Sequence, residues 1–241
     1  MIHLQGVTFS AESGAAVLSG AAAVFPPGCV STIIGAAGSG KTLLLLGILG
    51  DWKPTQGTIR VNGVDPVQDG LGLRRQICFI ARGAPLWPHL TVMEHVRLLV
   101  AVAQSLRPSD DEIVHALRVS DFPDRLLRRR AGVLTGLERL LVWLAVHRLR
   151  QTAILLADDP AADLSASDAA DAGRLIREGM TEHAVVVAAS RDPGFARAVG
   201  DQAFRLQQGR LEPITRHGDP DETTAVISSE RAWTDRLSPG F

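Results

Sequence analysis

The glycine-rich stretch GAAGSGKT, residues 35–42, restricts the possible folds of this chain more than any other feature. The β-branched run CVSTIIG leads into it, and the apolar run LLLLGILG follows it. It fits the pattern G-x-x-x-x-G-K-[ST], in which a buried strand passes through a phosphate-binding loop into a helix. We therefore expect a strand, this loop, and a helix that begins near Gly40 and ends at Gly50.

Each residue type in the loop has a physical role. Glycines let successive N–H groups point at one cluster of phosphate oxygens, and the helix start adds a positive dipole end. Lys41 should reach the β- and γ-phosphates, and the Thr42 hydroxyl should hold Mg²⁺. The alternative, a glycine-rich turn with a chance lysine, is disfavoured by the strand before it and the helix after it. The expected nucleotide-binding residues are Gly35, Ala36, Ala37, Gly38, Ser39, Gly40, Lys41 and Thr42.

A second apolar run ends on two adjacent aspartates, Asp158 and Asp159, in the stretch AILLADDPAADLS. Taken alone, this stretch is typical of a strand that runs out into a polar surface turn. In proteins with a phosphate-binding loop, however, a second strand brings an aspartate next to the Mg²⁺ ion. We assign Asp158 to that position, so Thr42 and Asp158 are the expected Mg²⁺ ligands.

The remaining sequence alternates between two patterns. The segments HLQGVTF, GTIRVNGVD, QICFIA, TAILLA and HAVVVAAS have the composition of strands, whereas residues 83–151 have helical periodicity, with Ser109 as a helix cap. The pattern predicts one α/β domain over residues 1–216, a helical subdomain inserted at about 83–151, and a C-terminal tail over residues 217–241.

Composition excludes several classes of protein. The chain has 241 residues and a net charge of −1, so it offers no basic surface for nucleic acid. Its two cysteines, Cys29 and Cys78, are interpreted as buried thiols in a reducing compartment. The seven histidines lack zinc spacing, so we expect no structural metal. No apolar run approaches the roughly 20 residues of a membrane span. We expect a cytoplasmic protein.

Four features in this order resemble the ATP-binding subunit of ATP-binding cassette (ABC) transporters: the loop, the helical insertion, LTGLE at residues 134–138, and ILLADDP. GTIRVNG, PLWPHLTVMEHV and QQGRLEP support the resemblance, which covers about residues 1–215. It implies a P-loop NTPase (RecA-like) fold with a mostly parallel sheet and antiparallel strands on the N-terminal side. It also implies ATP and Mg²⁺ as cofactors, and two subunits that sandwich ATP between the loop of one and the LTGLE-type signature of the other.

Three positions with catalytic roles in that family are altered here. The resemblance places Asp159 at the general-base glutamate, Arg82 at the glutamine that senses Mg²⁺ and water, and Arg191 at the switch histidine. Asp159 is one methylene shorter than glutamate, which makes it a weak base. A guanidinium cannot accept a hydrogen bond, but it binds phosphate strongly. These changes predict slow hydrolysis with ATP binding retained; the alternative is a site relaxed by loss of selection.

The signature and the base-stacking position also depart from the family pattern. Thr135 and Gly136 keep the hydroxyl and the first glycine of L-S-G-G-Q, and we count both among the expected nucleotide contacts. Leu137 and Glu138 replace its last two residues, so a negative charge lies where a γ-phosphate would approach. Ala11 stands where an aromatic side chain would stack on adenine.

The leading hypothesis is therefore an ATP-binding subunit of a membrane transporter with slow or impaired hydrolysis. It would lie at the inner face of the membrane, bound to a transmembrane subunit near Leu86 and Trp87, and it would pair with a second ATP-binding subunit, most simply a different chain. Two alternatives remain open. One is a non-hydrolysing structural partner in a heterodimer, and the other is a soluble regulatory ATPase without a transporter.

Overall fold

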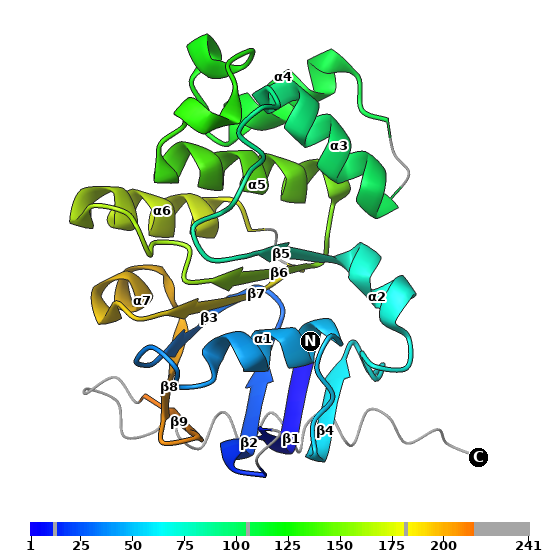
Figure 1. The fold of residues 1–241 in the computed structure, drawn as a ribbon, viewed down its shortest axis with the longest axis vertical. Coiled ribbons are helices and arrows are strands. Elements are labelled where there is room, and N and C mark those ends of the chain that lie inside the picture. Colours follow the sequence, from blue (N-terminus) through cyan, green and yellow to red (C-terminus); the bar gives the residue numbers. More distant parts are fainter. Residues whose placement is uncertain (12–13, 105–106, 181–182, 215–241) are drawn as a thin grey trace.

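The computed structural model describes residues 1–11, 14–104, 107–180 and 183–214 of the chain. Two sheets stand one above the other with helices between and above them (Figure 1). The described strands are β1 (Ile2–Ser10), β2 (Ala16–Phe25), β3 (Cys29–Ile34), β4 (Gln56–Val61), β5 (Ile77–Ile80), β6 (Ile154–Asp158), β7 (Val185–Ser190), β8 (Gln202–Gln207) and β9 (Arg210–Pro213). The described helices are α1 (Lys41–Leu49), α2 (Gly70–Gln76), α3 (Val92–Gln104), α4 (Asp110–Val119), α5 (Gly136–Arg150), α6 (Ala166–Glu178) and α7 (Pro193–Val199).

The larger sheet has the strand order β5-β6-β7-β3-β8-β9. All its neighbouring pairs are parallel except β8 and β9, and the smaller sheet β2-β1-β4 is antiparallel. The structure thus confirms a mostly parallel α/β core with antiparallel strands on the N-terminal side. Because β3, β6 and β7 run parallel, the loop and both aspartates leave the sheet at one edge.

Helix α1 lies between the two sheets (Figure 1). Leu44, Leu45 and Ile48 are fully buried in an apolar cluster that contains residues of both sheets. At Gly47 a Cβ would lie 2.4 Å from Cζ of Phe9, so only glycine fits at this contact. A helix buried on opposite sides needs no polar face, which explains the run KTLLLLGIL. This packing fixes the start of α1 at the end of the phosphate-binding loop.

The helical segment between β5 and β6 contains α3, α4 and α5, which pack on one another at the far side of the large sheet (Figure 1). Ser109 caps α4 as expected, with its hydroxyl accepting from the Glu112 N–H. Leu140, Leu144 and Val146 are buried in a second apolar cluster, which this segment shares with α6 and the upper face of the sheet. In the described part of the chain, no helix combines the length and apolar character that crossing a bilayer requires.

Several elements lack a clear sequence pattern. Strand β2 contains AVLSGAAAVF, whose small residues hide the alternation of a half-buried strand, and α2 contains two glycines. Helix α7 and strands β8 and β9 are short.

One expectation was wrong: Cys29 is only partly buried, because it begins β3. Cys78 is buried, and burial raises the pKa of its thiol to about 12. The expected tail, residues 217–241, lies outside the described residues.

Candidate functional site

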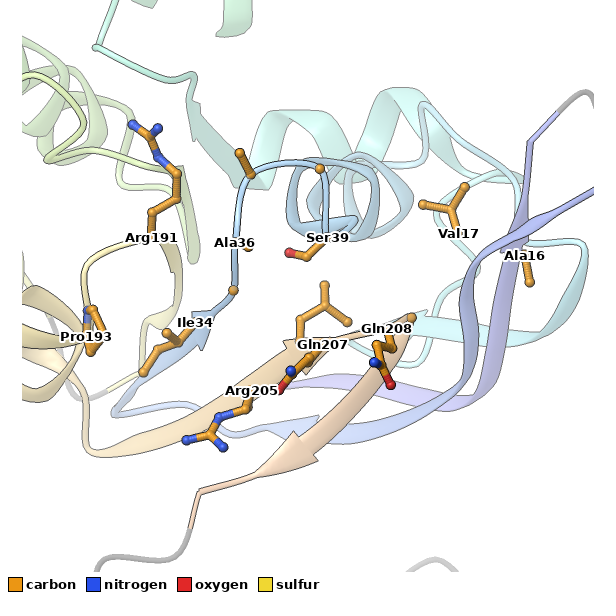
Figure 2. A pocket seen from close by; sticks show the side chains of 15 residues that line it. Ala16, Val17, Ile34, Ala36, Ser39, Arg191, Pro193, Arg205, Gln207 and Gln208 are labelled. Atoms are coloured by element: carbon orange, nitrogen blue, oxygen red, sulfur yellow. The ribbon is translucent and has the colours of Figure 1, made fainter.

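The loop between β3 and α1 borders a cavity of about 820 Å³. Its backbone turns through positive φ at Gly38 (76°) and Gly40 (102°), a region that L side chains rarely adopt. At Gly35 a Cβ would lie 2.5 Å from the Leu206 carbonyl oxygen, so the loop passes close to β8. Figure 2 shows the loop arching over the cavity, with Arg191 on one side and Val17 on the other.

Lys41 lies inside the curl of the loop. Its Nζ donates to the carbonyl oxygens of Gly35 at 2.7 Å and Ala36 at 2.8 Å, and Ser39 Oγ lies 3.5 Å away. The residue is 6% exposed. Burial lowers the pKa of Lys41, and the charges of Asp159 and Asp158 act against that shift. An ammonium held by neutral carbonyls at the centre of the loop is a suitable partner for a phosphate group.

The start of α1 is open. Its N-cap residue is Gly40, no side chain caps it, and its first turn contains no acidic residue. The first N–H groups of a helix lack intrahelical partners, and together with the helix dipole they bind anions. The open helix end, the loop and Lys41 therefore have the geometry and charge that suit phosphate oxygens.

Thr42 and Asp158 meet beside this loop. Thr42 Oγ1 donates to Asp158 Oδ2 at 2.7 Å, and Asp158 is buried at the end of β6. Mg²⁺ prefers hard oxygen ligands and takes one or two from the protein, with water and phosphate supplying the rest. The hydroxyl and the carboxylate fit that role. Within the described residues, no cluster of three or more His, Cys, Asp or Glu side chains is arranged to hold a metal without such help.

Asp159 forms an ion-paired cluster with two arginines. Arg191 Nε donates to Asp159 Oδ2 at 2.6 Å, and Arg82 Nε lies 3.9 Å from the same oxygen. The Asp159 side chain is only 8% exposed, and its backbone has a φ of 49°. The ends of β5, β6 and β7 thus bring together the three positions of the expected catalytic set.

The start of α5 is closed by its own side chains. Thr135 Oγ1 accepts from the Glu138 N–H at 3.2 Å, and Glu138 Oε2 accepts from the Thr135 N–H at 2.8 Å. This reciprocal arrangement is a capping box. A Cβ at Gly136 would lie 2.5 Å from Leu164 Cδ2, so a larger residue there would have to displace the Leu164 side chain. Neither Thr135 nor Gly136 lines the cavity around the phosphate-binding loop.

Comparison with known proteins identifies the family. The family model described as "ABC transporter" matches residues 18–162, which include the loop, both aspartates and the start of α5.

The chain belongs to the ABC transporter family.

Individual ABC relatives agree with this assignment. The thiamine import ATP-binding protein ThiQ of Ruegeria sp. (strain TM1040) is 29% identical over 214 residues, which cover 88% of this chain and 91% of the relative. The lipoprotein-releasing system ATP-binding protein LolD 1 of Rhodopirellula baltica is 33% identical over 215 residues, or 84% and 90% of the two chains. A dimeric, post-hydrolysis structure of the ATP-binding cassette MJ0796 with ADP and Pi has a TM-score of 0.77 at 23% identity, covering 91% and 100%, and shows the same fold.

The position that an ABC aromatic residue would fill lies apart from the cavity. Ala11 is exposed, and its N–H donates to the Ala15 carbonyl oxygen at 2.9 Å in the connection from β1 to β2. It does not line the cavity, whereas Val17 does. Sequence reasoning missed Arg205, Gln207 and Gln208 as lining residues (Figure 2). The QQGRLEP landmark pointed at this turn but gave no reason to place it beside the loop.

The expected docking region is partly exposed. Trp87 is 56% exposed, whereas Leu86 packs against the helical core. The Trp87 N–H donates to His95 Nε2 at 2.8 Å, and the two rings stack with centroids 5.2 Å apart. His95 is buried, and burial lowers its pKa, which favours the neutral ring that accepts this hydrogen bond. Sequence reasoning missed His95, although its burial follows from the helical period of α3.

Proposed function

We propose that this chain is the ATP-binding subunit of an ABC-type membrane transporter, with residues 1–216 as its ATP-binding domain. It binds Mg-ATP at residues 35–42 and drives or gates transport by nucleotide-dependent dimerisation. One observation carries the proposal. The start of α1 is open, and the Lys41 ammonium is held by carbonyl oxygens inside the loop that precedes it. The names of the relatives ThiQ and LolD, both ATP-binding proteins, support it.

Thr42 and Asp158 are the residues that would hold Mg²⁺, because their oxygens lie together beside the loop. When bound, the ion neutralises phosphate charge and orients the phosphates for attack by water. Lys41 and the first N–H groups of α1 then bind the phosphate oxygens. These contacts depend on residues that match the family pattern, so ATP binding should be intact.

Hydrolysis should be slow, because Asp159 is not free to act as a base. A general base must present a lone pair to water within hydrogen-bonding distance. Asp159 Oδ2 is already bound by Arg191 at 2.6 Å, with Arg82 nearby. The aspartate side chain is also shorter than the glutamate usual in the family. The site is therefore better suited to holding ATP than to cleaving it.

The second ATP-binding subunit is most simply a different chain. In a sandwich of two copies, both nucleotides would face a signature helix whose start is already occupied by Glu138. In a heterodimer, only the nucleotide on the partner's loop would face this capped signature, and that site would keep the partner's own base and switch residue. The other site would combine Asp159, Arg191 and Arg82 with the partner's signature. We propose that hydrolysis occurs on the phosphate-binding loop of the partner subunit, because a base is present there, while the site of this chain retains ATP longer.

The transmembrane partner is proposed to dock near Leu86 and Trp87, which would place the chain at the cytoplasmic face of the membrane. Trp87 is exposed and held by the buried His95, so its ring is presented in a fixed orientation. A stacked and hydrogen-bonded aromatic residue loses little further entropy on binding a partner.

Gentle purification of the chain from membranes, followed by native mass spectrometry and turnover measurements, tests the proposal. We expect a transmembrane chain and a second, different ATP-binding chain in the complex. Two copies of this chain as the only ATP-binding subunits would refute the heterodimer. A chain that purifies without any membrane partner would favour the soluble regulator, and a complex without measurable turnover would favour the non-hydrolysing partner. Inactivating the loop lysine of each chain in turn then tests which site hydrolyses ATP.

A further inference from the structure

The ion-paired cluster of Asp159, Arg191 and Arg82 has a feature that slow hydrolysis alone does not explain. A base that has merely weakened needs no guanidinium bound to it. Here Arg191 makes contact through Nε at 2.6 Å, and its backbone N–H also faces Asp159 Oδ1 at 3.5 Å. Two groups of the same residue thus face one buried carboxylate. The arrangement resembles a binding site for Arg191 more than a site for catalytic water.

Arg191 also faces the phosphate-binding loop. It lines the same cavity as residues 35–39, and Figure 2 shows its side chain beside Ala36. Its side chain is 38% exposed, whereas that of Asp159 is 8% exposed. One cation therefore contacts a buried carboxylate and also borders the cavity that the phosphate-binding loop lines. Carboxylate and phosphate use the same kind of charged hydrogen bond to guanidinium, so they compete for it.

We propose that Asp159 is an internal counter-anion, which holds Arg191 in the nucleotide-free chain and yields it to the terminal phosphate of a nucleoside triphosphate. The inference rests on the proposed function, because it requires nucleotide at the loop. A diphosphate lacks the third phosphate and leaves Arg191 on Asp159. The exchange would thus distinguish triphosphate from diphosphate, and Asp159 is a positioning residue rather than a catalytic base.

Arg82 makes this exchange possible. A buried carboxylate left without a partner is costly, so Asp159 could not otherwise give up Arg191. Arg82 Nε already lies 3.9 Å from Asp159 Oδ2, beyond hydrogen-bonding distance but close enough to take over with a small movement. Its side chain is 54% exposed and free to shift. The cluster therefore contains one carboxylate and two cations that can serve it in turn.

The test compares the affinities of the full-length chain for AMP-PNP and ADP, each with Mg²⁺, by calorimetry. AMP-PNP keeps three phosphates but is not cleaved, so turnover does not affect the result. Asp159→Asn is the informative variant, because asparagine tolerates the positive φ at this position and lacks the charge. Arg191→Ala and the double variant complete the cycle. Asp124→Asn, which removes the exposed partner of Arg118, is the control.

We expect Asp159→Asn to tighten AMP-PNP binding about tenfold and Arg191→Ala to weaken it about tenfold, the scale of one charged hydrogen bond. ADP affinity should change less than about twofold in both variants, and in the Arg191→Ala background the gain from Asp159→Asn should fall to about twofold or less. The control should match the wild type for both nucleotides.

Three results would overturn the inference. Unchanged AMP-PNP affinity in Asp159→Asn, with turnover alone reduced, would restore Asp159 as a base. A full gain that persists without Arg191 would show that Asp159 acts only through its charge. Weaker AMP-PNP binding in Asp159→Asn would make Asp159 a support for phosphate binding rather than a competitor. Failure of the folded wild type to bind either nucleotide would instead refute the proposed function.

Discussion

Two helices of this molecule start at positions where the ABC family binds phosphate, and their starts differ. Helix α1 begins at Gly40 with no side-chain cap and no acidic residue in its first turn. Helix α5 begins with the capping box of Thr135 and Glu138, and Arg125 Nη2 lies 3.9 Å from the Glu138 carboxylate. One helix leaves its first N–H groups for a ligand, whereas the other supplies its own anion. A helix start thus becomes a phosphate site only where side chains leave it open.

The two starts are also stabilised differently. An absent cap costs roughly 1 kcal/mol, and α1 tolerates this because Leu44, Leu45 and Ile48 are buried between two sheets. A bound phosphate can recover that free energy. Helix α5 is stabilised at its start without any ligand. The difference predicts stronger nucleotide binding at the loop of this chain than at its signature.

Removing Lys41 should have the largest effect on nucleotide binding at the open start of α1. Lys41→Ala deletes the ammonium inside the loop and should weaken ATP binding roughly 100-fold, the scale of two charged hydrogen bonds. Calorimetry with Mg-ATP measures it. The control is Lys53→Ala, which removes an exposed lysine outside the loop. Equal ATP affinity of the wild type and Lys41→Ala would show that residues 35–42 are not the phosphate site.

Restoring the family residues at positions 159 and 191 should have the second largest effect. The double variant Asp159→Glu with Arg191→His supplies a longer base and frees it from the guanidinium. Because loss of a general base costs ~10²–10⁴-fold, turnover in the native complex should rise at least about tenfold. Steady-state phosphate release measures it. A wild-type rate already near ~10 s⁻¹, the median for enzymes, would contradict the impaired-site account.

An aromatic residue at Ala11 should have a moderate effect. Ala11→Tyr offers the adenine ring a stacking partner and should tighten ATP binding by about 1 kcal/mol, or about fivefold. The expected change is the same for ADP, since both carry adenine, so titration with each nucleotide provides an internal control. If neither affinity rises, either residue 11 lies too far from the cavity to stack on the base or another side chain already covers it.

Neutralising the closed start of α5 should have the smallest effect. Glu138→Gln keeps the reciprocal cap but removes its charge, so self-association of the chain with AMP-PNP should strengthen about threefold. Sedimentation velocity with and without nucleotide measures this. Glu112→Gln makes the same change in the capping box of α4 and should have no effect. If both variants respond, or if neither does, the charge of Glu138 does not specifically weaken nucleotide-dependent self-association.

The sequence predicted some elements of the fold better than others. The loop motif and apolar run placed α1 correctly, because a helix buried on both sides is unambiguous once its start is known. The composition of GTIRVNGVD and TAILLA placed β4 and β6 correctly. The small residues of β2 carry almost no signal, since its pairing with β1 and its contact with β9 determine it.

The contacts within the site could be predicted only in part. The pairing of Thr42 with Asp158 follows from two motifs at the carboxyl ends of β3 and β6, which lie in one parallel sheet with β7 between them. The ion pair of Asp159 with Arg191 depends on β6 and β7 being adjacent, which the sequence did not specify. We expected both arginines at the γ-phosphate, but the structure places Arg191 on Asp159. Competition between a carboxylate and a phosphate becomes visible only when both positions are known.

Backbone amide hydrogen exchange, with and without Mg²⁺ and AMP-PNP, tests the central claim most directly. The claim is that the open start of α1 takes nucleotide and the capped start of α5 does not. For the full chain alone, the account predicts slower exchange over residues 35–42 on adding nucleotide and no change over residues 134–138. Exchange that slows equally in both segments, or only in residues 134–138, would contradict it.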